Sequence, residues 1–147
     1  MTAAEVFSIA NAFALAGWAI LIAAVIAKRP WLRDAVAGTI WPLLLSVLYV
    51  AALGLGWGST GGGFSSLAGV RQLFSGDWTL LAGWVHYLAF DLFVGSWIAA
   101  ETERAGLPRL VLIPLLPLTF LFGPVGFLLF LILRWTLTAG AAARRTS

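Results

Sequence analysis

Residues 78–100 are the clearest indication of how this chain folds. They read Trp-Thr-Leu-Leu-Ala-Gly-Trp-Val-His-Tyr-Leu-Ala-Phe-Asp-Leu-Phe-Val-Gly-Ser-Trp-Ile-Ala-Ala. A helix needs about 20 mostly apolar residues to cross the hydrocarbon core of a bilayer, and this stretch is long enough. It nevertheless contains His86 and Asp91. A carboxylate near the bilayer centre costs roughly 2.5–3.5 kcal/mol, so such residues usually face the interior of a helix bundle and mark function. The stretch therefore predicts a central membrane helix that carries the chemistry of the protein.

Three further apolar runs of spanning length flank this helix, at about residues 4–27, 36–55 and 110–137. The first could be a cleaved signal peptide, but it lacks a basic start and Lys28-Arg29 follows it, which favours a retained helix. The last is interrupted by Pro114, Pro117 and Gly123-Pro124, and interior prolines kink a helix. We therefore expect an all-α polytopic membrane protein, a bundle of four transmembrane helices with a proline-kinked fourth helix and both termini on one side.

The composition supports this class of protein and excludes others. The chain has 147 residues, of which 61% are hydrophobic and 10% charged, and its net charge is +3. A soluble domain is usually about half apolar and a quarter charged. Nine scattered basic residues do not make a surface that follows nucleic-acid phosphates, so we expect no nucleic-acid partner. With no cysteine and one histidine, we expect no metal site and no cofactor, and residues 1–147 form a single membrane domain.

The connections between the spans leave two questions open. Residues 56–77 begin with a glycine-rich run and continue with apolar residues at helical spacing, which fits either a short interfacial helix or an ordered loop. The orientation is close to balanced, because Lys28, Arg29, Arg33, Arg104 and Arg109 lie on one side and Arg71, Arg134, Arg144 and Arg145 on the other. The dense basic run after the first helix favours both termini outside.

Helix geometry limits how His86 and Asp91 can act together. Residues five apart on a straight helix point about 140° apart, so the two side chains do not form one hydrogen-bonded dyad. A pocket could still meet each group at one of its edges. The alternative is a structural role, in which Asp91 bonds to Asn11, Ser46 or Tyr49 of neighbouring helices. Gly95 is expected to permit close helix approach.

The runs Trp84-Val-His-Tyr-Leu-Ala-Phe-Asp-Leu-Phe-Val-Gly95, Gly106-Leu-Pro-Arg109 and Phe122-Gly-Pro-Val-Gly-Phe127 resemble the ABA4-like membrane proteins, whose plant member is associated with neoxanthin synthesis from violaxanthin. The resemblance covers about residues 78–135 most specifically. At the position after Gly95 the family pattern has a basic residue, whereas this chain has Ser96. The chain looks bacterial, which places it in the inner membrane.

The resemblance implies a role in carotenoid (xanthophyll) metabolism. Neoxanthin formation opens an epoxide and forms an allene by loss of a proton, without net redox change, so one acid and one base suffice. The resemblance thus makes Asp91 a candidate acid and His86 a candidate base of an isomerase. Aromatic side chains that could line a cleft for such a ligand, together with Gly95, are Trp84, Tyr87, Phe90, Phe93 and Trp97.

The alternative function is a non-catalytic lipid- or pigment-binding subunit that supports a partner enzyme. The expected partners are membrane lipids and a carotenoid or other apolar ligand, with a second copy of the chain or a partner membrane protein as further alternatives. A small transporter or channel is disfavoured, because the four helices lack a polar stripe and a second intramembrane acid.

Overall fold

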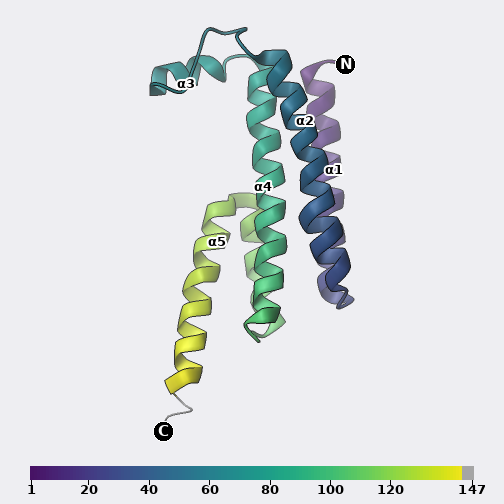
Figure 1. The fold of residues 1–147 in the computed structure, drawn as a ribbon, viewed down its shortest axis with the longest axis vertical. Helices are drawn as coiled ribbons and strands as arrows, with labels where there is room; N and C mark the ends of the chain where they lie inside the picture. The colour runs from purple at the N-terminus through teal and green to yellow at the C-terminus, as the bar shows by residue number, and fades with distance from the viewer. Residues whose placement is uncertain (144–147) are drawn as a thin grey trace.

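The structure is a computed structural model that describes residues 1–143, and these residues contain helices and no strand. Four helices are long and apolar enough to cross a membrane, so the predicted all-α membrane bundle is confirmed. Figure 1 shows the elements in order along the chain. They are α1 (Ala3–Ile26), η1 (Leu32–Ile40), α2 (Trp41–Gly56), α3 (Leu67–Leu73), α4 (Asp77–Arg104), η2 (Arg109–Val111) and α5 (Leu112–Ala143).

The first two spans form a hairpin whose ends follow from local sequence. Thr2 and Glu5 form a capping box at the start of α1, which satisfies backbone N–H groups that have no partner within the helix. The second span begins at Leu32, earlier than the predicted start at residue 36, because η1 is a π-helix continuous with α2. Pro42 therefore lies inside a continuous helix and not in its first turn. The wider π turns precede the proline, with the Trp41 N–H bonded to the Val36 carbonyl.

The connection between the second and third spans contains a short helix, α3, so its second half is helical. Ser66 caps α3 by accepting a hydrogen bond from the Gly69 N–H at 3.1 Å. In Figure 1, α3 lies near the N-terminal end of α4 and projects sideways, away from α1 and α2.

Helix α4 is the centre of the bundle, as predicted, and contacts α1, η1, α2 and α5. Small residues line its contacts with the first hairpin. Ala10 and Ala14 of α1 pack with Ala82 and Ala89 of α4 in one buried cluster. Small residues let helix backbones approach closely, which is how membrane helices gain packing energy without a hydrophobic driving force.

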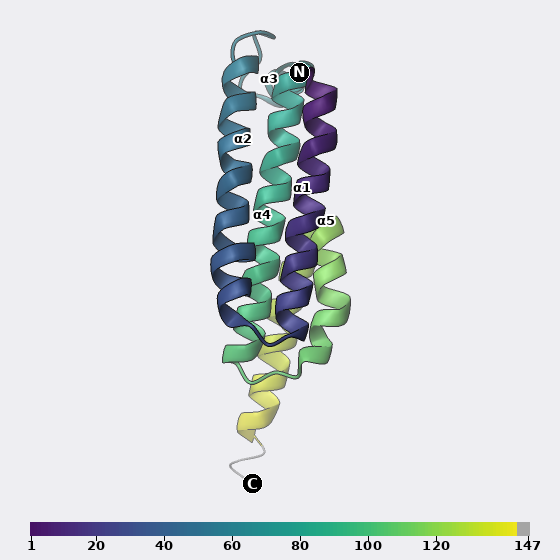
Figure 2. The ribbon, with the colours of Figure 1, turned by 90° about the vertical axis from the view of Figure 1, so that its right-hand side faces the viewer.

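The fourth span is not a single crossing. Its helical path is broken at Phe122, where φ is −146° and ψ is 61°. Figures 1 and 2 show that the first half of α5 rises to about the middle of α4 and that the second half turns back towards the end from which α5 started. At 1.5 Å per residue, Leu112 to Leu121 covers about 15 Å, half of a hydrocarbon core of about 30 Å. The predicted kink is present, but it reverses the chain.

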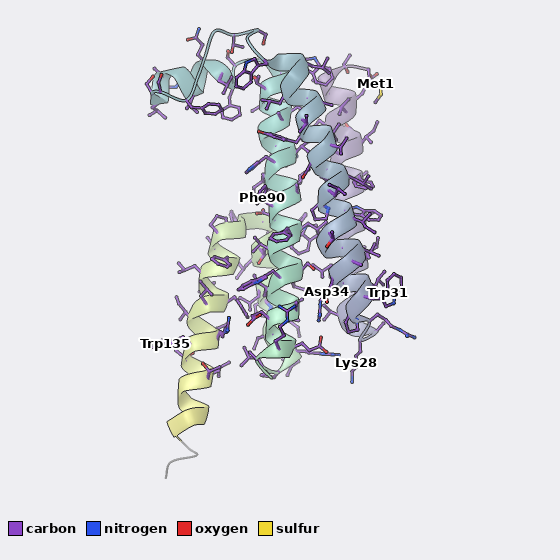
Figure 3. All side chains as sticks on the ribbon, in the orientation of Figure 1. Met1, Lys28, Trp31, Asp34, Phe90 and Trp135 are labelled. Atoms are coloured by element: carbon purple, nitrogen blue, oxygen red, sulfur yellow. The ribbon has the colours of Figure 1, made fainter. Side chains whose placement is uncertain are left out.

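This reversal overturns the expectation that both termini lie on one side. The N-terminus and the C-terminal end of α5 lie at opposite ends of the bundle (Figure 2). In Figure 3, Met1 marks one end, Lys28 and Trp31 mark the other, and Phe90 lies near the level of the break.

The reversal also changes the distribution of charge. Arg134 comes back to the end of α4, where it pairs with Glu101 at 3.0 Å. Among the described residues, Arg71 is then the one basic residue near the N-terminal end, and Arg144 and Arg145 lie outside the described part of the chain. The opposite end, called the basic end below, holds Lys28, Arg29, Arg33, Arg104, Arg109 and Arg134.

Candidate site at the break in the fourth span

The backbone at the break is hydrogen-bonded by a side chain of the central helix. Pro124 has no N–H, so it leaves the carbonyl four residues earlier, that of Phe120, without its helical partner. The Tyr87 hydroxyl donates to the Leu121 carbonyl at 2.7 Å and lies 3.2 Å from the Phe120 carbonyl. Broken backbone at membrane depth persists only where such groups find partners or a cavity. Tyr87 supplies the partner here.

Two glycines let the broken helix approach its neighbours. A Cβ atom on Gly123 would lie 2.7 Å from Cγ of Asp91, and one on Gly126 would lie 2.6 Å from the backbone N of Thr119. Ordinary contacts of a Cβ atom are 3.4–4 Å. Gly123 therefore brings the start of the second half-helix against α4, and Gly126 lets the two halves of α5 pack together.

Asp91 is buried inside the protein at this break, with 6% of its surface exposed. The backbone N–H of Gly123 and the Tyr87 hydroxyl are the polar groups that face the carboxyl. A helix N-terminus carries partial positive charge, so the start of the second half-helix is a favourable place for a carboxylate. Oδ2 of Asp91 has no hydrogen-bond partner among the described residues. An unpaired buried polar atom is rare and calls for an explanation, such as a role in catalysis or binding.

The prediction that Asp91 faces protein and not lipid is thus confirmed, but the predicted partners are wrong. The Asn11 side chain bonds to the Phe7 carbonyl and accepts from Trp84. Ser46 donates to the Pro42 carbonyl within its own helix. Helical serines often bond backward in this way, which removes them as partners for other helices.

A groove opens between α1 and α4 directly beyond the break. Because α5 turns back half-way, it covers these two helices only in the half near the basic end. A hollow of about 290 Å³ is lined by Asn11 and Leu15 of α1, Trp84 and Tyr87 of α4, and Leu121 at the break. A second hollow of about 350 Å³ shares Trp84 and continues past Phe7 towards the N-terminal end. We call the two together the α1–α4 groove.

The polar groups in the α1–α4 groove are held in place. The Trp84 indole N–H donates to Oδ1 of Asn11 at 3.0 Å, and Nδ2 of Asn11 donates to the Phe7 carbonyl at 2.8 Å. The Trp84 ring also packs on Phe7 and Tyr87, with ring centroids 5.7 and 5.3 Å apart. The groove is thus a mostly apolar channel with Tyr87 at its inner end, the Asn11–Trp84 pair along it and Asp77 near the N-terminal end.

His86 belongs to a different part of the surface. It lines a hollow of about 270 Å³ with Tyr49 of α2 and with Phe64 and Phe74, which flank α3. Its ring stacks on Phe90 with centroids 4.5 Å apart. The structure therefore does not bring His86 and Asp91 to one pocket, in line with their separation around the helix axis.

The remaining candidate residues are spread around α4. Phe90 and Phe93 face outward, with 55% and 50% of their surface exposed. Trp97 packs on Phe127 and Phe130 of the returning half of α5. Gly95 lies under the Trp18 ring of α1, close enough that a Cβ atom would meet Cζ3 at 2.9 Å. Of the predicted aromatic set, Trp84 and Tyr87 line the α1–α4 groove.

Sequence reasoning named Tyr87 only as a lining residue and missed its bonds to the break. Two spacings in the sequence carried the signal. Pro124 follows Phe120 by four residues, which frees the Phe120 carbonyl, and Tyr87 precedes Asp91 by four residues, which places both on the same face of α4. Within the described residues, no group of three or more His, Asp or Glu side chains could hold a metal ion.

The fold and the site define a multi-pass helical membrane protein with a broken fourth span and a buried carboxyl at the break. The chain belongs to the ABA4-like family, described as ABA DEFICIENT 4-like, which it matches over residues 5–130. The match therefore includes the first two helices as well as the part that carried the resemblance. No curated protein and no solved structure matches the chain.

Proposed function

We propose that the protein holds an oxygenated carotenoid in the α1–α4 groove and isomerises its end ring beside Tyr87 and Asp91. The single observation that supports this most is the unpartnered, buried Oδ2 of Asp91 behind the polar inner end of an apolar groove. A long, rigid, apolar molecule with polar end rings matches a channel whose walls are mostly apolar, with Tyr87 at its inner end and Asp77 near the other end. Membership of the ABA4-like family supports the same class of ligand.

The proposed reaction needs one proton given and one proton taken. The Asp91 carboxyl group, acting through the Tyr87 hydroxyl, gives a proton to the epoxide oxygen of the ring. The bond between this oxygen and the chain-bearing ring carbon breaks, and the oxygen becomes a hydroxyl. The proton on the adjacent chain carbon then passes through the same Tyr87 hydroxyl to the Asp91 carboxylate. The electron pair of the broken C–H bond forms the second double bond of an allene. The product is an isomer of the substrate, so no oxidant or reductant is required.

The proposal assigns both proton transfers to the side of α4 that carries Asp91. A base must lie within hydrogen-bond reach of the proton that it takes. His86 lines the separate hollow beside α3 and stacks on an outward-facing Phe90. The geometry therefore favours an accessory position for His86 and makes it a suitable control.

A second function is supported by a separate observation. Tyr87 satisfies the broken backbone and Asp91 packs against Gly123, so both residues also hold α5 in place. A protein that binds pigment for a partner enzyme would need the same residues for structure alone. We keep this binding subunit as the alternative.

The deciding experiment is pigment analysis of a host that makes epoxy- and hydroxy-carotenoids, with and without this gene. We expect a new isomeric pigment with the wild-type protein, none with Asp91→Asn, and undiminished conversion with the control His86→Gln. Asn keeps the size of the side chain but cannot deliver a carboxyl proton. Amounts are normalised to membrane-inserted protein.

Each contrary outcome has a defined meaning. Full conversion by Asp91→Asn would remove the proposed acid. Pigment that co-purifies unchanged with wild type and variant alike would favour the binding subunit. Loss of the Asp91→Asn protein itself from the membrane would assign this residue a structural role.

The described helices fit a multi-pass membrane protein, and we propose the bacterial inner membrane as its location. Short membrane-flanking segments on the cytoplasmic side carry an excess of Lys and Arg. The basic end would then face the cytoplasm and the N-terminus the outside.

A further inference from the structure

A second groove runs between α1 and the rising half of α5, near the basic end. Its volume is about 440 Å³, and its walls are Ile22, Val25 and Ile26 from α1 and Leu112, Ile113 and Leu116 from α5. Arg109 is the one charged residue among its lining residues. We call it the α1–α5 groove. It is separate from the α1–α4 groove, which lies beyond the break.

Arg109 lines this groove, and its guanidinium has N–H donors to spare for an anion. It lies 3.4 Å from the Val25 carbonyl and 3.6 Å from Oε1 of Glu103, and its side chain is 39% exposed. Both separations are long for a hydrogen bond. A guanidinium has five N–H donors, so most of them remain available.

Further positive charge lies beside Arg109. A small hollow that shares Val25, Arg109 and Leu112 with the groove is also lined by Lys28 and Arg29. Within the described residues, Lys28 and Arg29 form no ion pair, and both are exposed.

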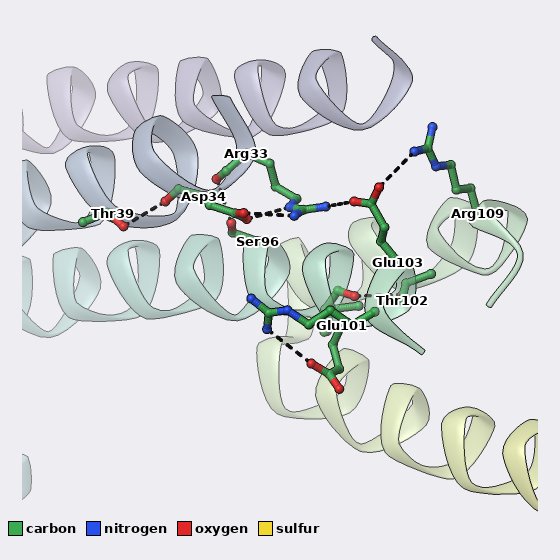
Figure 4. Close-up of polar contacts among 10 residues, drawn as sticks. Arg33, Asp34, Thr39, Ser96, Glu101, Thr102, Glu103 and Arg109 are labelled. Atoms are coloured by element: carbon green, nitrogen blue, oxygen red, sulfur yellow. Dashed lines mark hydrogen bonds and ion pairs between the residues drawn. The ribbon is translucent and has the colours of Figure 1, made fainter. Parts of the chain in front are cut away.

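The acidic residues nearby are already paired. Arg33 bonds to Asp34 and to Glu103, as Figure 4 shows, and Arg109 approaches the other oxygen of Glu103. Counting Lys28, Arg29, Arg33 and Arg109 against Asp34 and Glu103 leaves four positive charges against two negative ones, an excess of two.

We propose that the α1–α5 groove binds an anionic phospholipid of the surrounding membrane. One acyl chain lies along the apolar walls, and the headgroup phosphate is held by Arg109 with Lys28 and Arg29. Basic pockets between membrane helices on the cytoplasmic side bind anionic headgroups, and each nearby Lys or Arg contributes about 1 kcal/mol. A free phosphate would use the cations but leave the apolar walls unoccupied, which is why we assign the site to a lipid.

The test uses the full chain in mild detergent with phosphatidylglycerol and phosphatidylcholine of equal acyl composition, and counts bound lipids by native mass spectrometry. Wild type should prefer phosphatidylglycerol. Arg109→Gln should lower that preference about five-fold, because a loss of about 1 kcal/mol in binding free energy corresponds to a change of about five-fold in affinity. The double variant Lys28→Gln/Arg29→Gln, at exposed side chains that form no ion pair among the described residues, should also lower this preference. The matched control is Arg104→Gln, a cation at the same end whose partner is Glu101 and which does not line the groove.

A steric variant separates the groove from the charges. Ile113→Trp places a large ring in the groove from a position that is 68% exposed, and should lower phosphatidylglycerol binding with every cation intact. Leu43→Trp on the outer face of α2, at 60% exposure, is its control and should bind lipid as wild type does.

Three results would overturn the proposal. The first is equal binding of the two lipids by wild type. The second is an effect of Arg104→Gln as large as that of Arg109→Gln, which would indicate a general effect of net charge. The third is displacement of the bound lipid by inorganic phosphate, which would indicate a site for a soluble anion.

Discussion

The contact between Gly123 and Asp91 can be tested by adding one methyl group. In Gly123→Ala, the new Cβ atom would lie 2.7 Å from Cγ of Asp91, whereas ordinary contacts begin at 3.4 Å. The carboxyl group or the start of the second half-helix must therefore move by at least 0.7 Å. Overpacking a well-packed site by one methyl group costs about 1–3 kcal/mol. We expect a loss of this size in the free energy of unfolding.

A double variant shows whether the carboxyl group is the cause. The three atoms nearest the added Cβ atom all belong to the Asp91 carboxyl group. In an Asp91→Ala background these atoms are absent, so Gly123→Ala should cost much less there. Contacting residues show coupling energies of about 0.5–3 kcal/mol, and we expect a value in this range.

The assay is unfolding of the purified protein in mixed detergent micelles, followed by tryptophan fluorescence. Gly54→Ala is the control, because a Cβ atom there meets nothing within 4 Å. Exchanging a helical glycine for alanine at such a position should stabilise by up to about 1 kcal/mol. The proposed packing is refuted if Gly123→Ala is as stable as this control, or if its cost is unchanged when Asp91 is alanine.

Three other predictions concern the break, the basic end and the orientation. Tyr87→Phe leaves two carbonyls without their donor and should lower the free energy of unfolding by about 1–2 kcal/mol in the same assay. This is near the upper limit for hydrogen bonds inside membranes. A loss below about 0.3 kcal/mol, roughly half the mean for such bonds, would contradict the assigned bonds. Arg33→Ala should cost about 1–3 kcal/mol because this arginine is 10% exposed and ties η1 to α4. Arg104→Ala, which removes a 64% exposed arginine, should lower the free energy of unfolding by under about 1 kcal/mol. Equal losses for Arg33→Ala and Arg104→Ala would show that burial is not the reason for the larger effect. A single cysteine in place of Thr2 should react with an impermeant maleimide in intact cells. A single cysteine in place of Ala105 should react only after the cells are permeabilised, and the reverse pattern would show the opposite orientation.

Much of the membrane architecture could be predicted from the sequence because it depends on composition along the chain. The energy of placing an apolar run in a bilayer is nearly a sum over its residues, so the runs at 4–27, 36–55, 78–100 and 110–137 were recognisable. The inward position of Asp91 follows from the same energy, since a carboxylate in lipid is costly. The divergence of His86 and Asp91 follows from helix geometry alone.

The reversal of the fourth span was decided by tertiary structure. Pro117 and Pro124 predict a bend. Its direction depends on the backbone angles of Phe122 and on which groups donate hydrogen bonds to the carbonyls that lose their helical partners. Hydropathy cannot distinguish a straight span from a helical hairpin of the same residues, because both bury the same apolar side chains. Tyr87 and the space beside Gly123 make the hairpin possible, and they come from α4, a separate part of the chain.

The site and the charge distribution depend on that reversal. The α1–α4 groove exists because α5 covers only half the length of its neighbours, and the α1–α5 groove exists because the rising half stops at the break. Arg134 joins the basic end for the same reason, which turns a nearly even charge balance into a clear asymmetry. Composition and hydropathy along the chain were enough to predict a helical membrane protein with one inward carboxyl group. The path of α5, and with it both grooves, was decided by contacts between residues far apart in the chain, which no local pattern encodes.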